Sequence, residues 1–186
     1  RLSAGDFAEH RPRGIIGMVP GELVTTDQGY SDRIDPEWDI LKIAVVERHK
    51  NTHHIGIGYL QGYGLKHGAV ATSVSHDSHN IIVVGANEED MAAAVNRITE
   101  NHGGIVVMDH GEIKGEVVLN IAGIMSDDTL ENVNNSLEQA KEAAFALGVN
   151  HDIDPFMTLS FMSLPVIPKL RLTTRGVIDV ESQQYV

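Results

Sequence analysis

The chain contains no cysteine. This absence excludes disulfide bonds, thiolate zinc sites and cysteine nucleophiles, and it is compatible with a reducing compartment, so we expect a cytoplasmic protein. The sequence also lacks any run of about 18 apolar residues, which excludes a membrane-spanning helix. Its first residues, RLSAGDFAEH, hold neither a starting methionine nor the apolar stretch of a signal peptide. We therefore interpret the chain as a piece excised from a longer protein.

Basic residues are few, with 14 Lys and Arg against 26 Asp and Glu and a formal charge of -12. Proteins that bind nucleic acid or anionic membrane surfaces gather Lys and Arg on one surface. Here the one close basic group is Lys169, Arg171 and Arg175, and it is soon followed by Asp179 and Glu181. We expect neither a nucleic acid nor a membrane among the partners.

The length of 186 residues suffices for one domain with a substantial core. It is short for a complete β/α barrel, which needs about 250 residues. Because no linker or repeat interrupts the sequence, we predict one domain over residues 13–186, preceded by a loose arm of residues 1–12.

Two amphipathic helices are predicted, over residues 88–102 and 128–147. Asn87 is expected to cap the first, and Ser126 or Asp128 the second. The apolar residues of the second helix recur at steps of three and four, which is typical of one buried helix face: Leu130, Val133, Leu137, Ala140, Ala144 and Leu147.

Most of the remaining apolar segments have the composition of strands. Two of them, 40–47 and 80–84, are apolar on both faces and are expected at the centre of a covered sheet. A turn at residues 109–112 predicts a hairpin, with Gly111 at positive φ. The other predicted strands are 55–59, 70–74, 105–108 and 116–119. This order indicates an α+β fold with mixed or largely antiparallel sheets.

Residues 75–80, Ser-His-Asp-Ser-His-Asn, form the sharpest candidate site, because this polar segment separates two apolar strands. In an extended segment His76 and Ser78 would face one way and Asp77 and His79 the other. Asp77 and His79 could share a metal, or Asp77 could orient an imidazole for proton transfer. The alternative is a network that only caps the strand ends, to which Asn80 would also belong.

A second polar cluster follows the strand at 40–47. His49 and His53 have the spacing of a zincin helix, but Lys50 stands where that motif needs its Glu, so a metalloprotease is rejected. Glu47 and Arg48 are the candidate functional residues of this loop, because they leave a buried strand.

Two further stretches are interpreted as structural. The glycines between residues 56 and 68 do not match a dinucleotide or P-loop motif, so close backbone packing or a flexible flap is expected there. Residues 156–167, the most apolar dozen, are predicted to form a core strand and turn, or else a surface that packs on another domain.

Four segments together resemble the C-terminal domain of microbial adenine deaminase: LKIAVVERHK, QGYGLKHGAVATSVSHDSHNIIVVGANEEDMAAAVN, IAGIMSDDT and GVNHDIDPFMTLSFMSLPVIPKLRLTTRGVIDV. The resemblance extends from about Arg13 to Val180. Its most specific part is S-V-S-H-D-S-H-N-I-I-V-V-G, and one departure is Asn120, where the family pattern has proline.

The resemblance implies a metal-dependent, amidohydrolase-like enzyme of purine salvage that hydrolyses adenine to hypoxanthine and ammonia. It implies an iron or manganese ion held by a preceding barrel that begins its metal site with a His-x-His pair. Neither that pair nor enough residues for the barrel occur here. We expect a domain that is inactive alone, partners the barrel and adenine within a homo-oligomer, and carries no certain cofactor itself.

Three interpretations of the domain remain open. In the first, His76, Asp77, Ser78, His79 and Asn80 point at the mouth of the barrel and complete its active site. In the second, the domain only stabilises the barrel or forms the oligomer interface, through Phe156, Phe161 and Leu164 or its helix faces. In the third, the chain is a free-standing metal enzyme built on residues 76–80, which His49, His53 or His110 could join in space.

Overall fold

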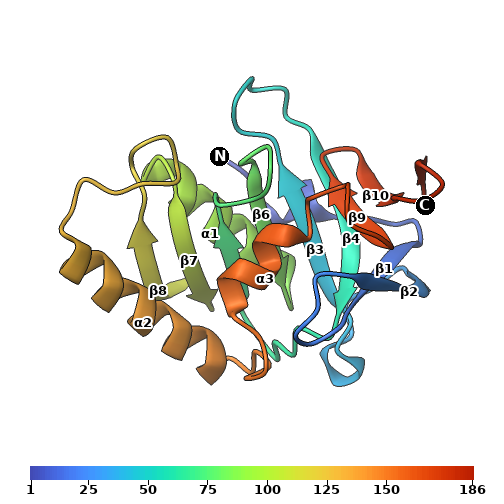
Figure 1. The fold of residues 1–186 in the computed structure, drawn as a ribbon, viewed down its shortest axis with the longest axis horizontal. Helices are drawn as coiled ribbons and strands as arrows, with labels where there is room; N and C mark the ends of the chain where they lie inside the picture. The colour runs from blue at the N-terminus through green and yellow to red at the C-terminus, as the bar shows by residue number, and fades with distance from the viewer.

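The computed structural model describes residues 1–186 and contains an eight-stranded mixed sheet at its centre (Figure 1). The strand order is β2-β1-β4-β3-β6-β5-β7-β8, in which β1 and β4 are parallel and all other neighbours antiparallel. This arrangement confirms the α+β class. The strands are β1 (Arg13–Met18), β2 (Thr25–Ser31), β3 (Leu41–Val46), β4 (Ile55–Gln61), β5 (Ala69–Thr72), β6 (Ile81–Gly85), β7 (Gly104–Asp109) and β8 (Glu112–Val118).

Both faces of this sheet are covered, as the apolar runs predicted. One face carries α1 (Glu88–Glu100) and a short 3-10 helix, η1 (Ala4–Phe7). The other carries α2 (Leu130–Ala146), α3 (Pro155–Phe161) and a small sheet of β9 (Leu170–Thr173), β10 (Gly176–Asp179) and β11 (Gln184–Tyr185). Alternate residues of β3 divide between the two cores: Ile43 and Val45 on one side, Ala44 and Val46 on the other.

The two predicted helices are present, and one cap is corrected. The Asn87 side chain accepts a hydrogen bond from the Asp90 N–H, as expected for the first helix. The cap of α2 is Thr129, and not Ser126 or Asp128. Leu130, the first residue of the predicted apolar stripe, is 86% exposed, because the first turn of α2 is left uncovered. The hairpin turn is confirmed, with Gly111 at φ +74.

The predicted strand within residues 156–167 is wrong, because this segment begins as helix α3. Asp154 caps α3 by accepting hydrogen bonds from the N–H groups of Phe156 and Met157 at 3.0 and 2.8 Å. Pro155 follows at the first helical position, where its fixed φ suits the helix and its missing N–H costs nothing. These local signals outweighed the apolar composition that suggested a strand.

Close backbone packing accounts for part of the glycine-rich stretch. A Cβ atom at Gly56, in β4, would lie 1.8 Å from the carbonyl oxygen of Thr173 at the end of β9. Only glycine lets the small sheet approach the large one so closely at this point.

The N-terminal residues, predicted to form a loose arm, lie partly against α1. The Phe7 side chain is fully buried, and Leu2 and Asn96 exchange two hydrogen bonds of 2.8 Å. None of the helices combines the length and the hydrophobicity that a membrane span requires.

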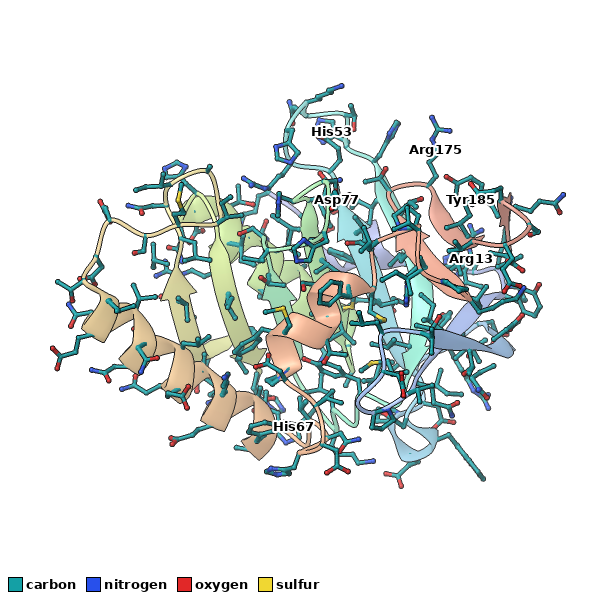
Figure 2. The ribbon with its side chains drawn as sticks, viewed as in Figure 1. Arg13, His53, His67, Asp77, Arg175 and Tyr185 are labelled. Atoms are coloured by element: carbon teal, nitrogen blue, oxygen red, sulfur yellow. The ribbon has the colours of Figure 1, made fainter.

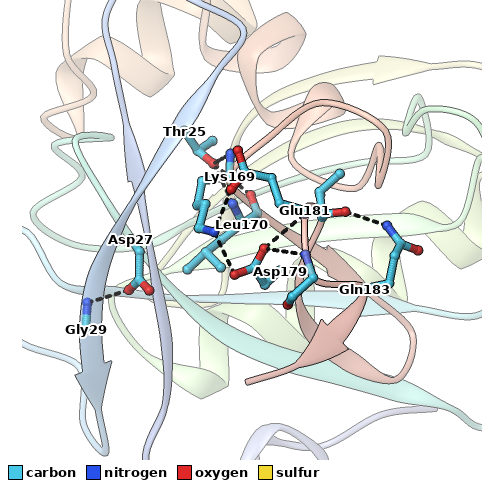
Figure 3. Close-up of polar contacts among 10 residues, drawn as sticks. Thr25, Asp27, Gly29, Lys169, Leu170, Asp179, Glu181 and Gln183 are labelled. Atoms are coloured by element: carbon cyan, nitrogen blue, oxygen red, sulfur yellow. Dashed lines mark hydrogen bonds and ion pairs between the residues drawn. The ribbon is translucent and has the colours of Figure 1, made fainter.

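The basic group near the C-terminus does not form a cationic surface. Lys169 lies 2.8 Å from both Asp179 and Glu181, as the close-up in Figure 3 shows, and these hydrogen bonds raise its pKa. Arg171 is fully buried, and burial lowers its pKa to about 10. That the protein binds no nucleic acid stays a prediction. Lys169 and Arg171 are already paired or buried and so are not available to bind phosphate groups.

Candidate functional site

Two polar clusters that are about thirty residues apart in the sequence meet at one end of the large sheet. Strands β3 and β6 are antiparallel, and Val46 pairs with Ile81. Glu47 and Arg48, which leave β3, therefore lie beside residues 75–80, which enter β6. Figure 2 labels Asp77 and His53 at this end, and we call residues 47–48 and 75–80 together the candidate site.

The Arg48 side chain forms hydrogen bonds to two other loops in and near the candidate site. Its Nε donates to the carbonyl oxygen of His79 at 2.6 Å, and its Nη2 donates to that of Ala122 at 2.7 Å. Its backbone N–H donates to the Asn80 Oδ1 at 3.3 Å, and the Asn80 residue is buried. Arg48 and Asn80 thus position the segment, and their polar groups are already engaged.

Glu47 is also hydrogen-bonded, through its carboxylate, to the loop that follows it in the sequence. Its carboxylate accepts hydrogen bonds from the backbone N–H groups of Thr52, Lys50 and His49 at 3.0, 2.7 and 2.6 Å. It also accepts one from the Thr52 hydroxyl at 3.0 Å. These bonds lower the pKa of Glu47 to about 2, so the group is ionised and orders residues 48–52.

Glu47→Gln is expected to loosen this loop. The folded pKa of about 2 lies below the ordinary 4.5, so the contribution of ionised Glu47 is complete above pH 4.5 and is lost as the pH falls toward 2. Near pH 6, hydrogen exchange at the amides of His49, Lys50 and Thr52 should become at least about fivefold faster, the equivalent of one net hydrogen bond. Glu22→Gln, at an exposed position, is the control; equal exchange rates in both variants would contradict this role for Glu47.

The imidazoles of His76 and His79 are not engaged. The segment forms a turn rather than an extended strand, so the alternation expected of an extended segment does not apply. The two ring centroids lie 5.8 Å apart. Neither imidazole makes a hydrogen bond within the protein, and the His79 Nδ1 is buried without a partner. Burial, with the nearby His76 and Arg48, lowers the pKa of His79, which leaves this imidazole neutral at neutral pH.

Helix α3 and the residues that follow it pack against this turn. This contact was not predicted from the sequence, because a strand was expected there. The ring of Phe161 stacks on His76 with centroids 4.9 Å apart, and the backbone N–H of His76 donates to the carbonyl oxygen of Ser160 at 3.0 Å. The Ser163 hydroxyl donates to the carbonyl oxygen of His76 at 3.0 Å and pairs with the Ser75 hydroxyl. The helix-start signal Asp154-Pro155 is the sequence feature from which helix α3, and so its contact with this turn, could have been predicted.

Asp77 and Ser78 are exposed beside a cavity of about 410 Å³, which Asn80, Ser163 and Thr173 also line. The Asp77 carboxylate has no partner within the protein, whereas the Ser78 hydroxyl accepts a hydrogen bond from the Asn80 N–H at 3.4 Å. His76, Asp77 and His79 are therefore the predicted residues whose functional groups remain free. The backbone of His76 and His79 is held by hydrogen bonds within the domain, while these three side chains are left for another molecule or domain.

A metal bound within this chain at Asp77 and His79 lacks a third ligand. The protein has one group of three His, Asp or Glu side chains whose ligand atoms converge, and neither Asp77 nor His79 belongs to it. His49 reaches the candidate site, but its Nε2 lies 2.6 Å from the carbonyl oxygen of Ser78. The candidate site does not by itself fit the iron or manganese of the resembled family.

Comparison with known proteins decides the family. Residues 21–184 match the family model described as the adenine deaminase C-terminal domain. The chain belongs to this family. An adenine deaminase of Bacillus subtilis is 50% identical to it over 178 residues, which cover 92% of this chain and 31% of the relative. Adenine deaminase 1 of Rhizobium johnstonii is 47% identical over 175 residues, or 90% of this chain and 30% of the relative.

The alignments cover nearly all of this chain but only part of each relative. An adenine deaminase of Bacillus velezensis is 45% identical over 195 aligned residues, which cover 100% of this chain but only 34% of the relative. The adenine deaminase C-terminal domain described here thus spans about a third of the length of the curated relatives that it matches.

Proposed function

We propose that this domain works within an adenine deaminase, where it completes an active site whose metal-binding part is a preceding barrel of the same polypeptide. The observation that carries the proposal is the buried, unpartnered Nδ1 of His79 beside the free carboxylate of Asp77. An unpaired buried nitrogen is costly, and a role in an active site is one explanation for such a group in a native structure. The reaction converts adenine and water to hypoxanthine and ammonia, in cytoplasmic purine salvage.

The free groups suit the purine. A neutral imidazole can accept a hydrogen bond at one nitrogen and donate one from the other. Adenine offers ring nitrogens that accept hydrogen bonds and an amino group that donates them. The Asp77 carboxylate can accept a hydrogen bond from that amino group, while His79 contacts a ring nitrogen or moves a proton. A manganese or iron ion held by the barrel would activate the attacking water. The residues of this chain would bind and orient the substrate.

This division of labour predicts that the purified chain alone releases no ammonia from adenine, even with Mn²⁺ or Fe²⁺ under reducing, anaerobic conditions. The intact enzyme under the same conditions is the positive control. Metal-dependent turnover by the isolated chain, abolished by His79→Ala, would locate the whole reaction in this domain and would contradict the proposal.

A second candidate function is a module that only stabilises the barrel or forms a homo-oligomer interface. Five apolar side chains between residues 118 and 130 are 38 to 86% exposed, which favours it: Val118, Ile121, Ile124, Met125 and Leu130. The residues first considered for this role are less suited, because Phe156 is buried and Phe161 stacks on His76. This function predicts that substitutions at His79 leave the turnover of adenine unchanged.

A further inference from the structure

Three side chains converge at the end of the sheet opposite the candidate site. His67 precedes β5, Asp109 ends β7 and His110 begins the turn to β8. The Nδ1 atoms of His67 and His110 lie 2.8 and 2.9 Å from the same oxygen, Oδ1 of Asp109. Figure 2 shows His67 at this end of the molecule and Asp77 at the other.

Close packing and hydrogen bonds hold the backbone around the three residues. Gly68, at φ +76, lets the chain after His67 approach β7 so closely that a Cβ atom there would lie 2.4 Å from the carbonyl oxygen of Met108. The buried carboxylate of Asp90, in the first turn of α1, accepts hydrogen bonds from the N–H groups of His110 and Gly111 at 3.1 and 2.8 Å. The strand pairing and this anchored turn therefore fix the three Cα positions.

The side chains of His67 and His110 are accessible to solvent, as those of a binding site must be, and do not form a network inside the core. The Asp109 side chain is 11% exposed, whereas those of His67 and His110 are 51% and 82% exposed. The nearly buried carboxylate of Asp109 is therefore in contact with two imidazoles that remain accessible from solvent.

We propose that His67, Asp109 and His110 bind a divalent transition-metal ion of the Zn²⁺ type. Imidazole nitrogen and carboxylate oxygen are ligands that Zn²⁺ prefers, and three protein ligands leave a fourth position for water. Binding requires each Nδ1 to lose its proton. Because both rings are exposed, their protons can move to Nε2, where water accepts the hydrogen bond.

The geometry needs only a small adjustment. Ligand atoms at about 2.0–2.2 Å from a tetrahedral ion are separated by roughly 3.4 Å from one another. The present nitrogen-to-oxygen distances are 2.8 and 2.9 Å, and all three ligand atoms lie within 4.8 Å of one another. Each of these two distances must lengthen by about 0.5 Å, and small rotations of the exposed His67 and His110 side chains would allow it.

The test is a calorimetric titration of this chain with ZnCl₂ in a buffer that does not chelate metals. We expect one ion per chain at this site, and at least about tenfold weaker binding in both Asp109→Asn and His110→Ala, because each removes one of three ligands. The His110 side chain is 82% exposed and its contact with Asp109 is therefore weak, so its replacement should lower the urea midpoint of the chain only slightly. Zn²⁺ should also shift the ring resonances of His67 and His110 in NMR spectra.

Two variants serve as controls. His151→Ala removes an exposed histidine elsewhere and should bind Zn²⁺ normally, and His79→Ala should do so as well. The proposal is overturned if the unsubstituted chain binds no Zn²⁺ at about 100 μM, or if Asp109→Asn and His110→Ala both bind as tightly as the unsubstituted chain. Loss of binding in His79→Ala alone would place the ion at the candidate site and would equally overturn it.

Discussion

His79→Ala in the full-length adenine deaminase is expected to lower kcat/KM for adenine by about 100-fold or more, which is the usual contribution of a positioned acid or base. His79 carries the one unpartnered buried nitrogen of the candidate site, and its lowered pKa keeps it neutral and able to accept a hydrogen bond. Steady-state kinetics should show most of the loss in kcat if His79 moves a proton, and in KM if it only binds the purine.

Further variants separate this role from a structural one. Asp77→Asn keeps the shape of an exposed side chain but removes its charge, so it should lower kcat/KM without changing the urea midpoint. His151→Ala, at an exposed position outside the candidate site, should leave the kinetics unchanged. If His79→Ala and Asp77→Asn both retain full kcat/KM and full metal content, the active-site role is refuted and the interface module is favoured.

Gly56→Ala is expected to destabilise this chain by about 3 kcal/mol or more, the upper end for a group forced into a packed interior. The added methyl group would lie 1.8 Å from the carbonyl oxygen of Thr173 and 2.7 Å from the backbone nitrogen of Gly176. Both obstacles are backbone atoms of the β9–β10 hairpin, so no side-chain rotation relieves the clash. Urea denaturation should show a markedly lower midpoint, or no folded baseline.

The matched control is Gly5→Ala, because there the added Cβ would lie 3.6 Å from the Ser3 hydroxyl, an ordinary contact. It should change the free energy of unfolding by less than about 0.5 kcal/mol, as most surface substitutions do. A Gly56→Ala chain as stable as the Gly5→Ala chain would show that the two sheets do not pack as closely as described.

Much of the fold was predictable because its signals are local. The apolar run of β3 on both faces, the Asn87 cap of α1 and the Gly111 turn each depend on neighbouring residues, and all three are present. Helix α3 was missed even though its signals were local, because apolar composition was given more weight than the Asp154-Pro155 start.

The sequence by itself determined the family, the α+β class and the residue types of the candidate site. Only the tertiary structure decided which of those residues are free, since Glu47, Arg48 and Asn80 are engaged by backbone groups that meet through the β3–β6 pairing. The convergence of His67 with Asp109 arises in the same way, from the β5–β7 pairing. Hydrogen bonding between strands distant in the chain sets these contacts, and no local periodicity encodes which strands become neighbours.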